Sequence, residues 1–332
     1  MAGYELRVLD GNHLPGSNKR LAVLRGHRGA ALPGQCIVVY DPDSGLVTDL
    51  IAGEDAHQSE RMLALPVLQG AKPGQVWIAD RHFCTRTLLV GWDEAGAGFI
   101  VREHAKHPRL ASRGEWRGGG RTDTGQVQEQ EIGLDGLARS WRCIELALDA
   151  PTEDGETTIR LWTNLPLSVS AAQVAELYRR RWRIEGMFQR LESVLHSEIS
   201  SLGHPRAALL GFAVSLLAYN VLALIGRCVE QAHHQPLAEP PPEVSMFHLA
   251  LTIKRGYEGM LIAVPPEHWT FWQQADPGAV AERLVQLARR IDPKQLATSK
   301  RKPKRAQLKG YVDGKTARAH VATARVLAQA RR

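Results

Sequence analysis

The sequence predicts an α/β fold: a mixed sheet flanked by helices, with an all-β insertion and a C-terminal helical region. Three observations predict it. The first hundred residues alternate between β-branched or aliphatic runs and amphipathic segments. Residues 104–166 have glycine-rich turns and alternating segments without helical periodicity. After residue 170, apolar residues recur at helical spacing.

Residues 1–103 form the first part of the expected core, and two of its strands end on an acid. Asp10 follows the strand that begins at Tyr4, and Asp80 follows a short apolar strand. The turn sequence at 41–45 predicts a β-hairpin. In order, the expected elements are strands at 4–9, 36–40 and 46–51, a helix at 57–65, a strand at 75–79, a helix at 85–92 and a strand at 98–102.

Residues 104–166 form the β-rich insertion, with strands expected at 127–132, 141–148 and 157–162. It contains three tryptophans, Trp116, Trp141 and Trp162. Aromatic faces can stack on an unstacked base, but packing within the sheet is the more favoured role for each of them.

Residues 167–235 form the second part of the core, and a helix from Ser170 to Leu195 is its most informative stretch. Ser170 and Gln173 predict a capping box at its start. At about 100° per residue, one face presents a phenol, a guanidinium and two carboxylates within roughly 60° of one another. They are Tyr178, Arg181, Glu185 and Glu192. An apolar helix is expected next, at 205–230.

Residues 236–299 form a helical region, with helices expected at 244–254 and 278–290, and residues 300–332 form a basic tail. The tail has eleven Lys or Arg residues and one acid, Asp313. We expect a solvated arm that neutralises DNA phosphates without reading sequence. The leading candidates for this contact are Lys300, Arg301, Lys302, Lys304 and Arg305.

Composition restricts the class of protein. The chain has 332 residues, a net charge of +7 and four cysteines without a C-x-x-C pair, which disfavours a zinc site or a disulfide framework. The N-terminus does not resemble a signal peptide. The apolar run 207–226 is long enough to span a bilayer, but its polar residues and the lack of a second such run favour a buried core helix. We therefore expect a cytoplasmic protein that does not enter a membrane, and its positive charge suggests an anionic partner such as DNA.

Asp10, Asp80 and Glu185 are the candidate catalytic residues. Carboxylates gathered at neighbouring strand ends repel one another unless they are protonated or bridged by a cation. Hard oxygen ligands favour Mg²⁺ or Mn²⁺, and two such ions suit phosphodiester displacement. Arg181, one turn from Glu185, could hold a phosphate beside them. His82, His104 and His107 have no tetrahedral spacing and are expected to be structural or exposed.

The segment Tyr178-Arg-Arg-Arg-Trp-Arg-Ile-Glu185 resembles the Tyr-x-x-Arg-x-x-x-Glu signature of bacterial insertion-sequence DDE transposases, of the type named for insertion sequence four. Leu9-Asp10-Gly11-Asn12 and Ile78-Ala79-Asp80-Arg81 resemble the first and second acid motifs of that family. A long β-rich insertion before the Glu is also a family trait, and the resemblance covers roughly residues 5 to 230.

The resemblance implies an RNase H-like catalytic core that cleaves and joins DNA strands, with metal ions held by Asp10, Asp80 and Glu185. Tyr178 and Arg181 would contact DNA, and so would their neighbours Arg81 and Trp182. The implied partners are transposon ends and target DNA, bound by a homodimer assembled on DNA.

Two features depart from the family pattern. Glu192 stands where the family has a Lys, seven residues after the Glu. The first strand begins almost at Met1, where family members have an N-terminal DNA-binding domain. We therefore expect that this part is encoded separately or that the chain is truncated. Two other hypotheses remain open: an impaired remnant that inhibits an intact transposase, and another RNase H-like nuclease.

Overall fold

The computed structural model describes residues 3–106, 108, 110–134, 140–152, 154–232, 244–252, 254 and 320–330, some positions between 271 and 283, and the short strands at 311–312 and 315–316. The helix expected at 278–290 lies almost wholly outside the described residues, and so do His107 and the basic positions from Lys300 to Arg305.

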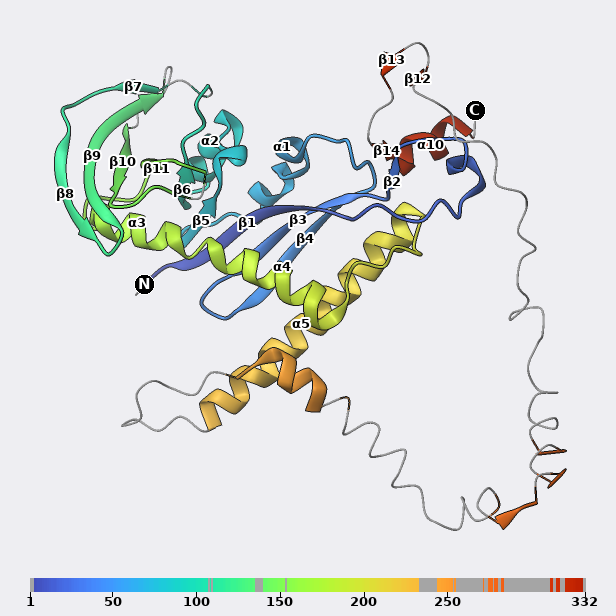
Figure 1. Ribbon diagram of the computed structural model, residues 1–332. Helices are drawn as coiled ribbons and strands as arrows, with labels where there is room; N and C mark the ends of the chain where they lie inside the picture. The colour runs from blue at the N-terminus through green and yellow to red at the C-terminus, as the bar shows by residue number, and fades with distance from the viewer. Residues whose placement is uncertain are drawn as a thin grey trace.

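A ten-stranded mixed sheet is the centre of the fold (Figure 1). Five strands form one half of it in the order β4-β3-β1-β5-β6. Their bounds are Glu5–His13 (β1), Gln35–Asp41 (β3), Leu46–Gly53 (β4), Gln75–Ala79 (β5) and Gly98–Arg102 (β6). β1, β5 and β6 are parallel, whereas β3 pairs antiparallel with both β1 and β4. This mixed sheet, flanked by helices, confirms the predicted fold class and is consistent with an RNase H-like fold.

The β-rich segment continues the same sheet. β11 pairs antiparallel with β6, and the order then runs β11-β10-β9-β7, with β8 also on β9. The strands are Leu110–Ser112 (β7), Arg117–Thr122 (β8), Gly125–Leu134 (β9), Ser140–Leu148 (β10) and Thr158–Thr163 (β11). The strands expected at 127–132, 141–148 and 157–162 are therefore present.

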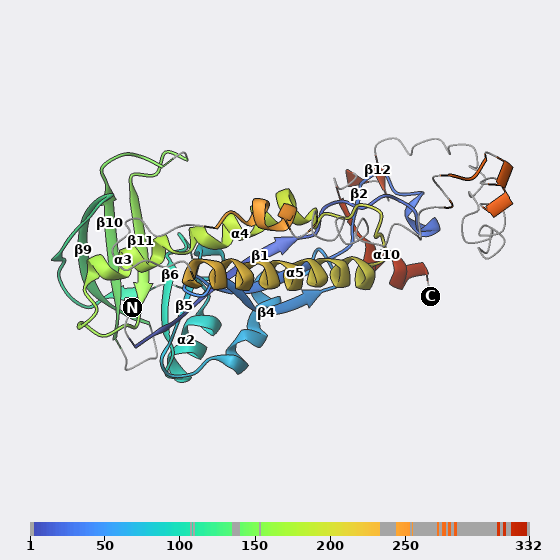
Figure 2. The same cartoon turned by 90° about the horizontal axis from the view of Figure 1, so that it is seen from below.

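Helices cover both faces of the sheet, because successive strand residues point to opposite sides. One core contains Val8, Ile78 and Ile100 and packs against α3 and α4. The other contains Leu9, Ala79 and Val101 and packs against α1 and α2. Figure 2 shows α4 and α5 crossing one face of the sheet. The helix bounds are Glu60–Leu63 (α1), Arg86–Glu94 (α2), Ala171–Arg179 (α3), Trp182–Leu195 (α4) and Pro205–Ala232 (α5).

The helix expected to run unbroken from Ser170 to Leu195 is two helices, so that prediction was wrong. The Ser170–Gln173 capping box is present, but α3 ends at Arg179 and α4 begins at Trp182. Between them the N–H groups of Arg180, Arg181 and Arg183 donate to carbonyls three residues back, at 2.9–3.1 Å. This local tightening preserves the apolar periodicity, which is why the periodicity did not reveal it.

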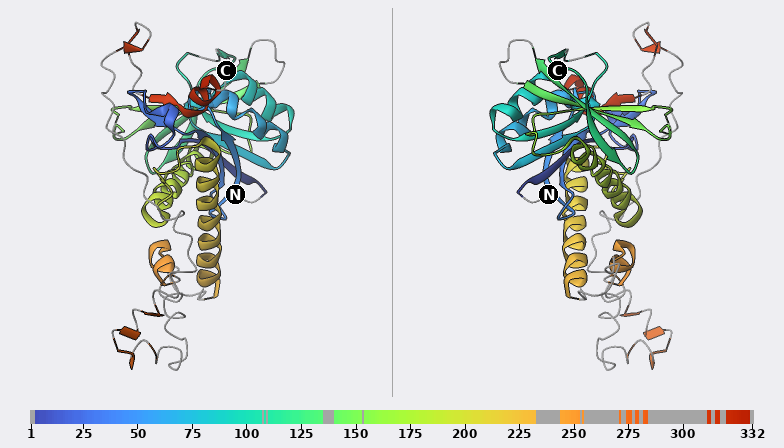
Figure 3. Two further views of the ribbon diagram at one scale, coloured as in Figure 1. Left: turned by 90° about the vertical axis from the view of Figure 1, so that its right-hand side faces the viewer. Right: turned by 90° about the vertical axis from the view of Figure 1, so that its left-hand side faces the viewer.

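α5 is buried on one face only. Asn220 fixes it to β4, because its amide accepts the Val47 N–H and donates to the Val47 carbonyl, both at 2.8 Å. Figure 3 shows the helix projecting from the sheet. Among the described residues α5 is the one helix long and apolar enough to cross a membrane, and 33% of that stretch is buried. The residues on its exposed side are apolar: Leu210, Val214, Leu217, Val221 and Leu224.

The end of the chain returns to the core. β14 (His320–Ala322) pairs parallel with β2 (Ala30–Leu32), and α10 (Thr323–Ala330) follows at once. Val326 packs with Leu24 and Ala31. Residues 320–330 therefore do not belong to a solvated arm, contrary to the prediction for the tail, because their apolar side chains find partners in the segment around Ala31.

Candidate functional site

Three neighbouring parallel strands place three functional side chains in a row. The register pairs Leu9 with Ala79, and Ala79 with Val101. The residues that follow these, Asp10, Asp80 and Arg102, are therefore side by side. Asp80 directly follows β5, but Asp10 lies inside β1, so the prediction that this strand ends at Leu9 was wrong: its pairing with β3 continues to His13. Side chains alternate along a strand, so these three point away from the face that holds Leu9, Ala79 and Val101.

The opposite face is the one that α3 and α4 cover. Tyr178 from α3 and Ile184 from α4 share a core with Val8 and Ile78, the residues that precede Leu9 and Ala79. Asp10, Asp80 and Arg102 consequently face the helices that contain Tyr178 and Glu185. The structure thus brings together the acids and the helical residues that the sequence selected.

Local hydrogen bonds fix the carboxylates of Asp10 and Asp80. The Gly11 N–H donates to Asp10 Oδ1 at 2.9 Å. The His82 N–H donates to Asp80 Oδ1 at 2.8 Å, so Asp80 caps the short 3-10 helix Arg81–Phe83. Asp80 therefore caps a short helix, as an Asp after a strand often does, and also lies beside Asp10 and Arg102.

Arg181 lies between the acid of β1 and the acid of α4. Its Nη2 is 2.7 Å from Glu185 Oε1, and its Nη1 is 3.7 Å from Asp10 Oδ2. The Arg181 side chain is 12% exposed and that of Glu185 is 43% exposed. The buried Nε of Arg181 has no hydrogen-bond partner among the described residues. The guanidinium thus links two of the candidate acids from the inside of the site.

Burial raises the pKa of the Asp10 carboxyl to about 7, although the Arg181 charge opposes the shift. The nearby Asp80 and Glu185 carboxylates raise it further. Burial also raises the pKa of the Tyr178 hydroxyl, against the charges of Arg181 and Arg102. The charges of Arg181, Asp80 and Glu185 therefore act on Asp10, and those of Arg181, Arg102 and Asp80 act on Tyr178.

The donor set suits a hard divalent cation, because it consists of carboxylate oxygens that repel one another. In this conformation, however, no group of three His, Cys, Asp or Glu side chains within the described residues is arranged as a metal site. Arg181 supplies the positive charge between Asp10 and Glu185 instead. A cation that used both acids would require this guanidinium to turn away.

The sequence reasoning missed Glu60, which connects the two acid-bearing segments. Glu60 Oε1 is 3.2 Å from His13 Nδ1, and Glu60 Oε2 is 3.2 Å from His82 Nε2. The His13 contact lowers the pKa of Glu60, and the Glu60 contact raises the pKa of His13. A Cβ on Gly11 would lie 2.7 Å from Glu60 Oε1, so a larger residue there would displace the Glu60 carboxylate from its present position. No spacing rule joins these residues, which meet only through the fold.

The structure gives a specific contact for each of three other residues that the sequence analysis singled out. Arg81 forms an ion pair with Glu156 at 3.1 Å. Trp182 is 62% exposed, beside the Arg181 guanidinium. Glu192 Oε2 accepts the Glu198 N–H at 3.0 Å, so this carboxylate has a local partner after α4.

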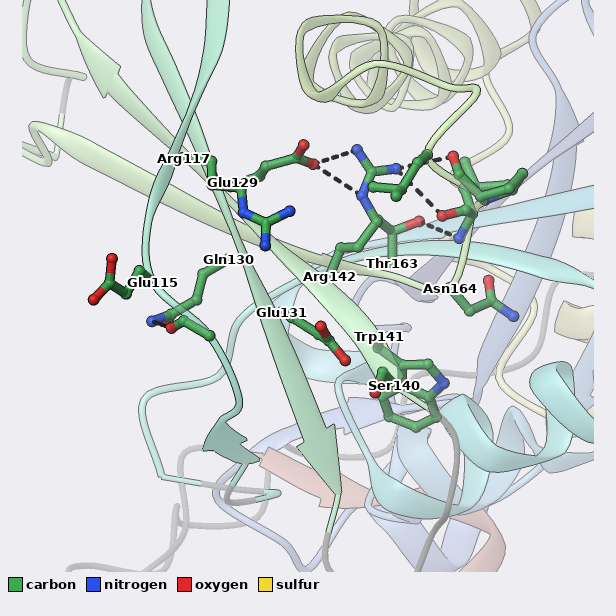
Figure 4. A pocket seen from close by; sticks show the side chains of 14 residues that line it. Glu115, Arg117, Glu129, Gln130, Glu131, Ser140, Trp141, Arg142, Thr163 and Asn164 are labelled. Atoms are coloured by element: carbon green, nitrogen blue, oxygen red, sulfur yellow. Dashed lines mark hydrogen bonds and ion pairs between the residues drawn. The ribbon is translucent and has the colours of Figure 1, made fainter.

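Two of the three tryptophans of the β-rich segment pack within the sheet, the role that the sequence analysis favoured. Trp141 and Trp162 are buried at 2% and 3% exposure, and Trp116 is 38% exposed. Trp141 lines a cavity of about 350 Å³, seen in Figure 4. Beside it Arg142 forms an ion pair with Glu129. Packing within the sheet accounts for the two buried rings.

The comparisons with known proteins agree with this geometry. A family model described as "Transposase DDE domain" matches residues 2–221. The InsL transposase for the insertion sequence element IS186A of Escherichia coli (strain K12) is 28% identical over 263 residues, which cover 65% of each chain. The transposase for insertion sequence element IS421 of Escherichia coli is also 28% identical over 263 residues, covering 65% of this chain and 64% of its own.

The present chain thus spans less than two thirds of the length of these curated relatives, 65% of the first and 64% of the second. The family model covers Asp10 and Asp80, the helix with Glu185 and most of α5. The chain belongs to the transposase DDE domain family.

Proposed function

We propose that the chain is the catalytic part of an insertion-sequence transposase, which cleaves and joins DNA by metal-dependent phosphodiester transfer. The observation that supports this most is the β1–β5 register. It sets Asp10 beside Asp80, and electrostatic coupling links Asp10 to Glu185 on α4. In this proposal Asp10, Asp80 and Glu185 hold Mg²⁺ or Mn²⁺, as two ions. Cations bound there would activate the attacking group and stabilise the leaving oxygen.

The other residues act on the DNA. Arg181 is a buried guanidinium already within reach of two of the acids, so it can transfer its hydrogen bonds to a phosphate that enters beside them. Tyr178, with its hydroxyl close to Arg181, would help to position that phosphate. Trp182 and Arg81 are exposed at the rim of the site. The basic positions 300–305 are proposed to hold the flanking duplex, on a homodimer assembled on DNA, with end recognition by a separately encoded part.

A strand-joining assay tests this function. The protein is incubated with Mg²⁺, a supercoiled plasmid and a labelled oligonucleotide that has a free 3′-hydroxyl. We expect nicked plasmid and label joined to it, and Asp80→Asn should abolish both. Glu176→Gln is the matched control, because Glu176 is an exposed acid on α3 that pairs with Arg179 at 3.0 Å. Cleavage without joining would indicate a nuclease instead, and unchanged activity of Asp80→Asn would refute the proposed site.

Glu192 favours one second candidate. A carboxylate where the family has a cation weakens attraction for DNA on that face of α4. A protein impaired in this way could inhibit an intact transposase through mixed assembly. Co-expression of the chain with an active relative separates the two functions, since an inhibitor must lower the frequency of transposition.

A further inference from the structure

A second cavity, of about 600 Å³, lies beside the row formed by Asp10, Asp80 and Arg102. Arg81 and Arg102 line it, together with Glu156 and Arg160. Arg81 follows Asp80 directly, and Arg102 is the neighbour of Asp80 in the row, because Ala79 pairs with Val101. Arg102 also acts on the pKa of Tyr178. The cavity is therefore an extension of the candidate active site toward β6 and β11.

One carboxylate neutralises both of the arginines nearest to Asp80. Glu156 Oε1 is 3.1 Å from Arg81 Nη1, and Glu156 Oε2 pairs with Arg102 Nη2. The two contacts lower the pKa of Glu156, that with Arg102 contributing most. Glu156 thus presents one oxygen to each guanidinium. A phosphodiester, whose two non-bridging oxygens share one negative charge, presents the same pattern to a pair of arginines.

The third arginine has its own partners. Arg160 Nε is 2.6 Å from Glu145 Oε2, and its Nη1 is 3.8 Å from Glu103 Oε2. Two acids therefore hold Arg160, whereas Arg81 and Arg102 share Glu156. The shared carboxylate is the one whose removal would leave two positive charges facing the cavity.

Glu156 is part of a surface turn and can be displaced without disturbing the sheet. The turn is closed by the Thr152 N–H donating to the Glu156 carbonyl at 2.9 Å. The side chains of Arg81, Glu156 and Arg102 are 53%, 31% and 20% exposed. Water reaches all three, and ion pairs in such positions contribute little to stability. A DNA phosphate could therefore exchange with this carboxylate.

We propose that this cavity is a binding subsite for a DNA backbone phosphate next to the scissile position. In the free protein Glu156 occupies Arg81 and Arg102 as a substitute anion, and the phosphate replaces it when DNA binds. The proposal rests on the proposed function, and it adds Arg102 and Glu156 to the DNA-contacting machinery. Glu156 consequently weakens DNA binding.

Fluorescence anisotropy with a labelled duplex of arbitrary sequence tests the subsite, in EDTA so that no metal-dependent cleavage occurs. Glu156→Gln should tighten binding by about two- to fivefold, the range of one exposed ion pair. It should also steepen the slope of log K against log salt by up to about 0.9. In an Arg81→Ala/Arg102→Ala background, the same change should no longer tighten binding.

Asp149→Asn is the matched control, because Asp149 is another exposed acid of the β10–β11 connection that pairs with an arginine, Arg121, at 2.7 Å. It removes the same charge outside the cavity. Equal gains from Glu156→Gln and Asp149→Asn would overturn the subsite. If the unchanged protein still nicks and joins DNA in Mg²⁺, only the subsite is refuted. If no variant and no unchanged protein binds DNA, the proposed function fails as well.

Discussion

Arg142 should be a main support of the site, although it touches none of the proposed catalytic residues. Its Nε is 2.9 Å from Glu129 Oε2. Its Nη1 donates to the carbonyls of Leu165, Pro166 and Val169 at 2.9–3.2 Å. These carbonyls belong to the turn that leads into α3, so one guanidinium joins β10 to the start of the helix with Tyr178 (Figure 4).

Arg142→Met keeps most of the side-chain volume and removes every one of these bonds. Loss of one partner of a buried ion pair costs about 3–5 kcal/mol, because the other charge is left without compensation. The Glu129 side chain is 21% exposed, so water can reach it. We therefore expect the lower end of the range, a loss of about 3 kcal/mol in the free energy of unfolding.

Urea unfolding followed by circular dichroism measures this loss as a lower midpoint at constant slope. Arg121→Met is the control, because the Arg121 side chain is 54% exposed and its pair with Asp149 should contribute no more than about 1 kcal/mol. Adding Glu129→Gln to Arg142→Met should recover part of the loss by removing the unpaired charge. Equal midpoints for Arg142→Met and Arg121→Met would refute the role given to the network.

Three further changes probe the site itself. Gly11→Ala should displace the Glu60 carboxylate, because the new Cβ would lie 2.7 Å from Glu60 Oε1. Since that carboxylate is the end of a flexible side chain and its histidine partners are half-exposed, the free energy of unfolding should fall by no more than about 1 kcal/mol; Gly26→Ala, with open space around it, is the urea-unfolding control. The raised pKa of Asp10 means that the fold binds a proton more tightly than the unfolded chain does, so the stability this proton provides is lost as the pH rises from about 4 through 7. In EDTA, Asp10→Asn should therefore be more stable than the parent at about pH 8, by up to about 4 kcal/mol, but not at about pH 4; equal pH profiles would contradict the burial of this carboxyl. Glu192→Lys should tighten DNA binding in anisotropy measurements, and no change would show that this part of α4 does not meet DNA.

The sequence was sufficient where the signal is local. Asp10 and Asp80 are recognisable in the sequence because each directly follows a short apolar run. The start of α3 is recognisable because Ser170 and Gln173 form a capping box. Tyr178, Arg181 and Glu185 were found together because they share helical spacing. The three side chains still lie near one another although the helix breaks at Arg180. A short stretch of tighter turns bends the helix but keeps its side chains in nearly the same order around the axis.

The residues that were missed depend on contacts between distant segments. Arg102 joins the row only through the register of β5 and β6. Glu60 contacts His13 and His82 from a short helix, beside Gly11. Residues 320–322 pair with a strand 290 positions earlier in the chain. Neither composition nor periodicity encodes such pairings, because both describe one segment at a time.

Binding of Mn²⁺, followed by the loss of its free-ion paramagnetic resonance signal, tests the central claim most directly. It needs neither specific DNA ends nor a partner protein. We expect the parent protein to bind Mn²⁺, and Asp80→Asn and Glu185→Gln to weaken the binding about tenfold or more, because each removes a charged ligand. Glu176→Gln, which removes an equally exposed acid outside the site, should bind like the parent. Equal Mn²⁺ affinity in all four proteins would contradict the assignment of these acids as the metal ligands.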